Sequence, residues 1–351
     1  MDSKELLTRI WNLEQVERPA LILEEPEYQY QPLDPDASLE EIFQNRYQKY
    51  LALKGHCHDH LETLDCVLGT HVIACAFGAE ERIFEDGHRY IKKTIITCPA
   101  DVDHLRPADL KAGPLGKQIE ILKYFADRTK GEEIPIRIGD IQNPLGVAEM
   151  LWETENFYTS LYEAPEQVHK LLDMITEVVI EYASSMLEIG EQVVPIAWPL
   201  VWAPKGKGIY LADDTMSMLS PDMYEEFGVF YNNRISDAFG GIMFHSCVIN
   251  ERYFDKIAKN KNLRSINFAA QYSSDMSKIF SYFGGKAVIM PHYVHTDNPQ
   301  IGTVEEFIQK VFTCWTPQSP CMIYVMENPD SLSQANVLDA YQTSLSKWNK
   351  A

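Results

Sequence analysis

Short apolar runs alternate with longer amphipathic segments along most of this chain, and this alternation limits its possible folds more than any other feature. About seven runs have the length of a β-strand: residues 70–77, 134–139, 192–197, 241–247, 263–269, 286–290 and 321–326. Helix-length segments lie between them, and in residues 165–190 Val168, Leu171, Ile175 and Val179 recur at helical spacing. Repeated strand-helix units are typical of a parallel sheet buried beneath helices. The sequence therefore predicts an α/β fold.

Two architectures satisfy this pattern, an open doubly wound sheet and a closed (β/α)8 barrel. A dinucleotide-binding fingerprint would favour the open sheet. The nearest glycine cluster, Gly206-Lys-Gly208, follows Trp202-Ala-Pro204 and does not open a helix after a strand, so it is interpreted as a loop. Periodicity alone leaves both architectures open.

The first 55 residues differ from the rest of the chain. Residues 1–35 combine short helical signals with a stretch rich in Pro and Tyr at 25–32, which predicts an extended arm and no barrel strand. Ser38 and Glu41 have the spacing of a capping box, which predicts a helix running to about Lys54. We therefore expect residues 1–55 to form an arm and a helix that pack on a barrel of residues 56–351.

Charge and composition narrow the class of function. The chain has 51 acidic and 31 basic side chains, a formal net charge of −20, and nucleic-acid binding depends on clustered Lys and Arg. It has no stretch of about 18 apolar residues, and residues 1–18 lack the apolar centre of a signal peptide. We expect no nucleic acid, no membrane and a cytoplasmic location. The odd number of cysteines, seven, favours free thiols or metal ligands over disulfides.

A His-x-Cys pair ends one predicted strand. His245 and Cys247 stand two residues apart, and the period of a strand sends both side chains to the same face. Imidazole nitrogen and thiolate sulfur are donors that zinc favours. The spacing alone also fits packed core residues. By contrast, the donors at residues 56–60 are more typical of a solvated helix end, although His56 and His60 could share a helix face.

Four segments, taken together and in order, resemble the uroporphyrinogen decarboxylase superfamily. They are residues 69–78, 138–145 with the helix start at Thr154, 212–227 and 241–247. This superfamily includes the decarboxylase itself and the zinc-dependent corrinoid or coenzyme M methyltransferases. The resemblance implies a single (β/α)8 TIM barrel with its site at the C-terminal ends of the strands. Its methyltransferase branch implies a zinc-dependent enzyme that moves a methyl group between a corrinoid (cobalamin) protein and a small acceptor or donor.

The resemblance also implies a ligand set, and the sequence departs from it. The methyltransferases use His-x-Cys, here His245 and Cys247, and a later cysteine whose place Met326-Glu327-Asn328 holds. Glu327 is the predicted third ligand, because a carboxylate can bind zinc. His292 is an alternative donor and His295 a weaker one. Cys321 begins the same strand and is expected at the opposite end of the barrel.

Further site residues are implied by the resemblance, which places the loop of Asp213 and Asp214 at the pocket, and by the position of Asp140 and His292 after predicted strands. We expect catalytic roles for Asp213 and Asp140, and substrate contacts from Asp214, Tyr210, His292 and Trp202. Solvated loop carboxylates and aromatic rings that pack at the core or rim are the alternative interpretation. Ser220 and Pro221 predict a helix start just beyond the two aspartates.

Two other functions stay open at this point. A metal-free decarboxylase would need several Arg or Lys residues for its substrate's carboxylates, and residues 19–45 contain none. A barrel without its third ligand would only bind a small molecule or a partner. The expected partners are a corrinoid protein and a small-molecule methyl donor or acceptor, with a homodimer as an open alternative.

Overall fold

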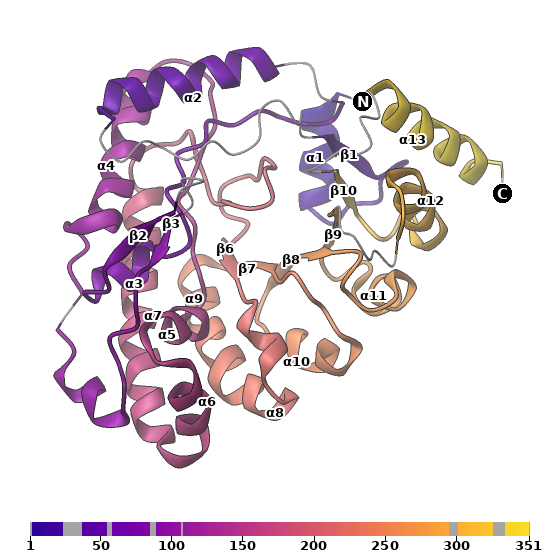
Figure 1. Ribbon diagram of the computed structural model, residues 1–351. Coiled ribbons are helices and arrows are strands. Elements are labelled where there is room, and N and C mark those ends of the chain that lie inside the picture. The colour runs from indigo at the N-terminus through magenta and orange to yellow at the C-terminus, as the bar shows by residue number, and fades with distance from the viewer. Residues whose placement is uncertain are drawn as a thin grey trace.

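A parallel sheet of six strands forms the centre of the computed structural model, which describes residues 2–23, 37–54, 58–84, 89–106, 108–294, 301–325 and 334–350 (Figure 1). The strand order is β1-β10-β9-β8-β7-β6, and each neighbouring pair is parallel. The strands are β1 (Ala20–Leu23), β6 (Ile209–Ala212), β7 (Ile242–His245), β8 (Leu263–Ala269), β9 (Val288–Tyr293) and β10 (Met322–Val325).

Shorter segments continue this sheet into a ring. β4 (Ile136–Arg137) pairs in parallel with β5 (Val193–Val194), and Ala212 N of β6 donates to Ile141 O beyond β4. On the other side, Leu64 N donates to Pro135 O, and Asp59 N donates to Leu21 O of β1. Backbone hydrogen bonds thus lead from strand to strand around the ring, and the chain has the (β/α)8-barrel fold.

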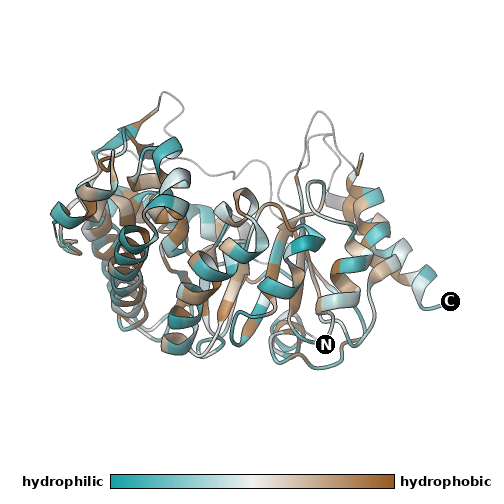
Figure 2. Cartoon of the chain, turned by 90° about the horizontal axis from the view of Figure 1, so that it is seen from below, coloured by the Kyte–Doolittle hydropathy of each residue, from teal (hydrophilic) through white to brown (hydrophobic). Residues whose placement is uncertain are grey.

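Helices surround the strands (Figure 1). They are α1 (Ser3–Trp11), α2 (Leu39–Leu53), α3 (Val72–Ala76), α4 (Gly113–Arg128), α5 (Pro144–Leu151), α6 (Thr154–Glu163), α7 (Pro165–Leu187), α8 (Pro221–Tyr224), α9 (Phe230–Phe239), α10 (Phe254–Ile257), α11 (Met276–Phe283), α12 (Val304–Cys314) and α13 (Gln334–Trp348). A hairpin of β2 (Glu81–Ile83) and β3 (Arg89–Ile91) follows α3. Apolar residues gather on the strands, and polar residues colour the outward helix faces (Figure 2). Among the described residues, no helix has the length and apolar character that crossing a membrane requires.

Most predicted elements are confirmed. Ser38 and Glu41 form the capping box of α2, with Glu41 N donating to Ser38 Oγ and Ser38 N to Glu41 Oε2. Ser220 caps α8 by accepting from Met223 N. Strands occur within the apolar runs at 134–139, 192–197, 241–247, 263–269, 286–290 and 321–326.

The strand predicted at residues 70–77 is wrong, because Val72–Ala76 forms helix α3. A short apolar run has no periodicity that separates a buried strand from a buried helix turn. The barrel position before α3 belongs instead to residues 59–64, whose backbone bonds to β1 and to Pro135.

The prediction that residues 1–35 hold no barrel strand is also wrong. β1 pairs with β10 in the register Leu21↔Ile323, and all four of its residues are buried. A run of four apolar residues directly after Pro19 gives too weak a strand signal to recognise. The boundary between residues 55 and 56 stays a prediction, but residues 20–23 belong to the barrel. The arm predicted at 25–32 lies outside the described residues.

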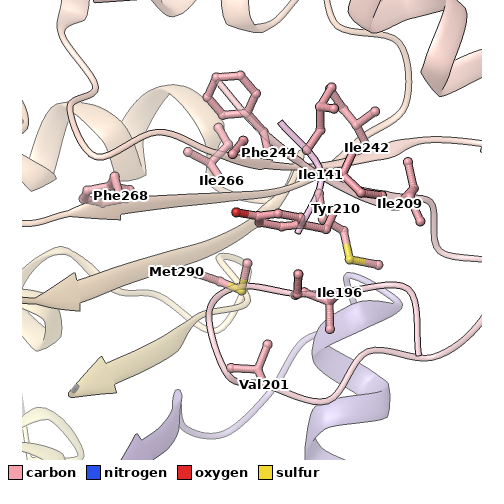
Figure 3. Close-up of a cluster of buried hydrophobic side chains, with 14 of the residues drawn as sticks. Ile141, Ile196, Val201, Ile209, Tyr210, Ile242, Phe244, Ile266, Phe268 and Met290 are labelled. Atoms are coloured by element: carbon pink, nitrogen blue, oxygen red, sulfur yellow. The ribbon is translucent and has the colours of Figure 1, made fainter. Parts of the chain in front are cut away.

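Apolar side chains fill the barrel interior beneath the polar site. The loop between β5 and β6 brings Val201 close to Ile196, Tyr210 and Met290 on one side of the strands (Figure 3). Phe244 and Ile266 lie on the opposite side of the same strands (Figure 3). Apolar side chains thus bury these strands from both sides.

Candidate metal centre at the barrel mouth

His245 and Cys247 converge at the end of β7. His245 is the last residue of the strand and is 6% exposed, whereas Cys247 borders on solvent. Cys247 Sγ lies 3.6 Å from His245 Nε2. The two side chains thus point toward a shared point at the mouth, as their spacing predicts, and their role as metal ligands stays a prediction.

Asp214 adds a third donor at the same point. Its Oδ2 lies 3.9 Å from His245 Nε2, and its Oδ1 accepts a 2.6 Å hydrogen bond from Cys247 N. One ligand atom from each of Asp214, His245 and Cys247 lies within 4.8 Å of the others. Neighbouring donors around a tetrahedral zinc ion are separated by about 3.5 Å, given its bond lengths. The three side chains fit such an ion with small movements.

The loop after β6 is fixed from several directions. Asp213 N donates to His245 O, which places the aspartate pair beside the end of β7. The buried Asp213 carboxylate accepts 2.9 Å hydrogen bonds from Tyr224 OH and Asn232 Nδ2. Thr215 Oγ1, one residue beyond Asp214, donates to Glu149 Oε2 of α5. Asp214 is therefore presented to the mouth by a well-anchored loop.

Asn267 of β8 orients the imidazole of His245. Asn267 Nδ2 donates to Met290 O at 2.7 Å, which directs Asn267 Oδ1 toward His245 Nδ1, 2.6 Å away. Because this oxygen accepts, the Nδ1 atom carries the proton. The lone pair of Nε2 then faces Cys247 and Asp214, which is the tautomer that a metal ligand needs.

Asp140, Tyr210 and His292 lie around His245 deeper in the barrel. Asp140 accepts hydrogen bonds from Gln142 Nε2 at 2.7 Å and from Tyr210 OH at 3.3 Å. The rings of Tyr210 and His292 have their centroids 6.4 and 6.0 Å from that of His245. The structure thus brings three predicted site residues together in one polar layer.

Burial governs the protonation of this layer. It raises the pKa of Asp213 to about 6 and that of Asp140 above its usual value, against the hydrogen bonds that both receive. Burial, reinforced by His245, lowers the pKa of His292 to about 3. Partial burial and the Asp214 charge raise the pKa of the Cys247 thiol to about 12. Without a cation nearby the thiol keeps its proton, and a bound metal ion would reverse this.

Other predicted residues lie elsewhere or outside the described structure. Trp202 packs against the core, and its carbonyl oxygen accepts from Trp11 Nε1 of α1, while its contact with substrate stays a prediction. Cys321 is buried just before β10. Glu327, His295 and His56 lie outside the described residues.

Two residues of the polar layer were not predicted. Asn267 interrupts the apolar run of the predicted strand at 263–269, and a buried polar residue inside a predicted strand was the signal available for it. Gln142 follows the predicted strand at 134–139 by three residues, and no comparable signal was available for it.

Comparison with known proteins places the chain in a family. The family model described as uroporphyrinogen decarboxylase (URO-D) matches residues 3–290. A methylcobamide:CoM methyltransferase MtbA of Methanosarcina acetivorans is 24% identical over 159 residues, 44% of this chain and 42% of the relative. A methylcobamide:CoM methyltransferase MtaA of Methanosarcina barkeri is 27% identical over 122 residues, 34% of this chain and 32% of the relative.

A second kind of relative and a solved structure complete the comparison. A uroporphyrinogen decarboxylase of Aliivibrio salmonicida is 29% identical over 161 residues, 44% of this chain and 40% of the relative. The chain therefore spans less than half the length of these curated relatives. A solved methyltransferase from Methanosarcina mazei shares the fold over 99% of both chains, with a TM-score of 0.70 and 16% identity.

Proposed function

Because the chain belongs to the uroporphyrinogen decarboxylase family, we propose that it is a corrinoid-dependent methyltransferase with a zinc centre at the barrel mouth. His245, Cys247 and Asp214 would hold the ion, and a methyl group would move between a corrinoid protein and a small acceptor or donor. The observation that carries the proposal is the convergence of their three donor atoms within 4.8 Å. The methylcobamide methyltransferases among the relatives support it.

Each residue of the centre has a separate task in this proposal. A zinc ion bound here would supply a Lewis acid that favours the thiolate form of a substrate thiol. Cys247 and Asp214 provide negative donors at the solvent side, and Asn267 keeps the Nε2 lone pair of His245 directed at them. Asp213 acts as a positioning residue through Tyr224 and Asn232. Glu327 remains the alternative to Asp214 as the third ligand.

A decarboxylase is the second candidate, since some relatives carry that name. Such an enzyme must hold several substrate carboxylates, usually with Arg. Residues 19–45 contain no Arg or Lys. In the described parts of the chain, no Lys or Arg lies within 4.0 Å of Asp140, Asp213 or Asp214 in an ion pair. The lack of Lys and Arg beside these carboxylates favours methyl transfer over decarboxylation of a substrate that carries several carboxylates. The corrinoid partner, a homodimer and a cytoplasmic location stay predictions.

Demethylation of free methylcobalamin by a thiol tests the proposal, since the loss of its methyl group changes the visible absorption. We expect zinc-dependent demethylation by the wild type, and a loss of at least about 100-fold in Cys247→Ser, because the variant lacks a ligand to the Lewis acid. Cys98→Ser is the matched control, since Cys98 is exposed and lies outside the site. Consumption of uroporphyrinogen together with inactivity toward methylcobalamin would instead support the decarboxylase.

A further inference from the structure

Lys and Arg are scarce in the segments that follow the barrel strands. None occurs in residues 19–45, 138–169, 195–204, 213–233, 294–309 and 326–346. In barrel enzymes these loops build the site. An anion entering the mouth would therefore find few cations to bind it.

The segments after β7 and β8 and the β2–β3 hairpin do contain cations, and three of these are engaged elsewhere. Arg252, after β7, donates to Ser217 O and stacks on Tyr253, and Lys278, at the start of α11, pairs with Glu251. On the β2–β3 hairpin, Arg89 pairs with Glu81. In the described structure no Lys or Arg forms an ion pair with Asp140, Asp213 or Asp214, and the basic neighbour of Asp214 is His245.

Asp140 is one of these carboxylates. It is 7% exposed, and the neutral groups of Gln142 and Tyr210 are its hydrogen-bond donors. Burial of a carboxylate without a cationic partner raises its pKa, as found for Asp140. A positive ligand charge would relieve this cost, whereas a negative one would add to it.

Aromatic rings also favour a positively charged ligand. The Trp198 ring meets His292 and Tyr324 edge to face, with centroid distances of 6.3 and 5.7 Å. Faces of Trp and Tyr rings attract cations through their quadrupole. The deep layer thus offers a carboxylate and aromatic surface.

We propose that the small molecule that reaches the metal centre carries a positive charge and that Asp140 selects it over anionic analogues. This inference rests on the proposed function and adds the charge class of the substrate. It places the reacting heteroatom at His245, Cys247 and Asp214, and the positive group deeper, beside Asp140. An anionic thiol such as a sulfonate is disfavoured by the same residues.

Binding of three matched thiols to the full chain loaded with Co²⁺ tests the inference. Thiolate ligation changes the cobalt absorption spectrum, and each thiol has the same two-carbon link. The cation is 2-mercaptoethyl-trimethylammonium, which cannot chelate through nitrogen, its uncharged isostere is 3,3-dimethylbutane-1-thiol, and the anion is 2-mercaptoethanesulfonate. We expect dissociation constants to rise in this order, with a difference of at least about tenfold between cation and anion. Equal or tighter binding of the uncharged or anionic thiol would overturn the inference.

Asp140→Asn tests the residue itself. Removing its charge should bring the ratio between the dissociation constants of the cationic and uncharged thiols close to one. Asp237→Asn is the matched control, since Asp237 pairs with Lys261 on the surface of α9, and its ratio should stay that of the wild type. The wild-type series decides the charge class even if Asp140→Asn does not fold. A reversed order with intact spectra refutes only this inference, whereas spectra that no thiol changes refute the metal-centred function as well.

Discussion

The orientation of the His245 imidazole depends on the side-chain amide of Asn267 on the neighbouring strand β8. Asn267 bonds at once to His245 Nδ1 and to Met290 O, so β8 and β9 together determine where His245 Nε2 points. Partners of this kind typically change metal affinity by about 10- to 100-fold when removed. The hydrogen bond therefore matters to a metal centre, whereas a merely packed histidine would tolerate its loss.

Asn267→Ala should weaken zinc binding by about 10- to 100-fold, because His245 loses the acceptor that fixes its tautomer. Competition with a chromophoric chelator measures the dissociation constant. Asn349→Ala, at an exposed position after α13, should leave the constant unchanged. Equal zinc affinity in Asn267→Ala and the wild type would contradict a liganding role for Nε2.

At the scale of single residues, the sequence predicts which side chains could bind a metal better than it predicts which side chains contact one another. The spacing of His245 and Cys247 was enough to place both side chains on one face. It could not show that Asp214, predicted as a substrate contact, lies between them, because that contact depends on the pairing of β6 with β7. Nor could it show that Asn267 contacts His245, since those residues belong to different strands.

Among the elements, the pairing of β6 with β7 sets the distance between Asp214 and His245. Gly208 precedes β6 at φ +97°, and a Cβ there would lie 2.5 Å from Gly241 O. Gly206, in the same loop at φ +77°, has open space around such a Cβ. The two glycines share the left-handed backbone and differ in the room available to a side chain.

Gly208→Ala should therefore destabilise the fold by roughly 3 kcal/mol or more and weaken zinc binding, because the clash pushes β6 away from β7. Gly206→Ala should cost only about 1 kcal/mol, the penalty of its positive φ, and leave zinc affinity unchanged. Chemical denaturation and zinc titration give both quantities. Similar values for the two variants would argue against close packing as the cause.

A buried ion pair connects other elements of the barrel wall. Asp65, after residues 59–64, lies 3.2 Å from Arg137 Nη2 of β4 and 3.9 Å from Arg46 Nη1 of α2. Burial opposes ionisation of Asp65, but the two guanidinium groups outweigh it and lower its pKa below the usual value. The carboxylate is thus ionised in the fold at a pH where the unfolded chain begins to take up protons.

Because the pKa of Asp65 is lower in the folded chain, the ion pair stabilises the fold above the unfolded-state pKa of about 3.9. This stabilisation is lost as the pH falls through the folded-state pKa. Asp65→Asn should cost about 3 kcal/mol at pH 7 and lose stability less steeply than the wild type on acidification. Chemical denaturation between pH 7 and 3 measures the free energy of unfolding of the wild type and the variant. Asp237→Asn is the surface control and should cost at most about 1 kcal/mol. Parallel pH profiles for wild type and Asp65→Asn would refute this role.

Element prediction succeeded where the pattern was long or capped. The 23 residues of α7 and the capping box of α2 left little ambiguity. The four residues of β1 and the five of α3 were missed, because tertiary pairing decides the structure of such short apolar runs. β1 depends on β10, about 300 residues further along the chain, as its partner.

For the whole molecule, the alternation of strands and helices was sufficient to predict an α/β fold, and the family resemblance was needed to choose the barrel. The net charge of −20 excludes partners that need a basic surface but does not by itself locate a site. Only the folded chain shows that Asp214 lies beside His245 and Cys247. The chemistry of the mouth is therefore a property of the closed ring.

X-ray absorption at the zinc edge of the zinc-loaded chain tests the central claim most directly. The account predicts one sulfur neighbour at about 2.3 Å, from Cys247, and nitrogen or oxygen neighbours at about 2.0–2.2 Å, from His245, Asp214 and a solvent or substrate atom. The sulfur signal should disappear in Cys247→Ser and persist in Cys98→Ser. A shell without sulfur, or one with two sulfur neighbours, would contradict the assignment of His245, Cys247 and Asp214 as the protein's ligands.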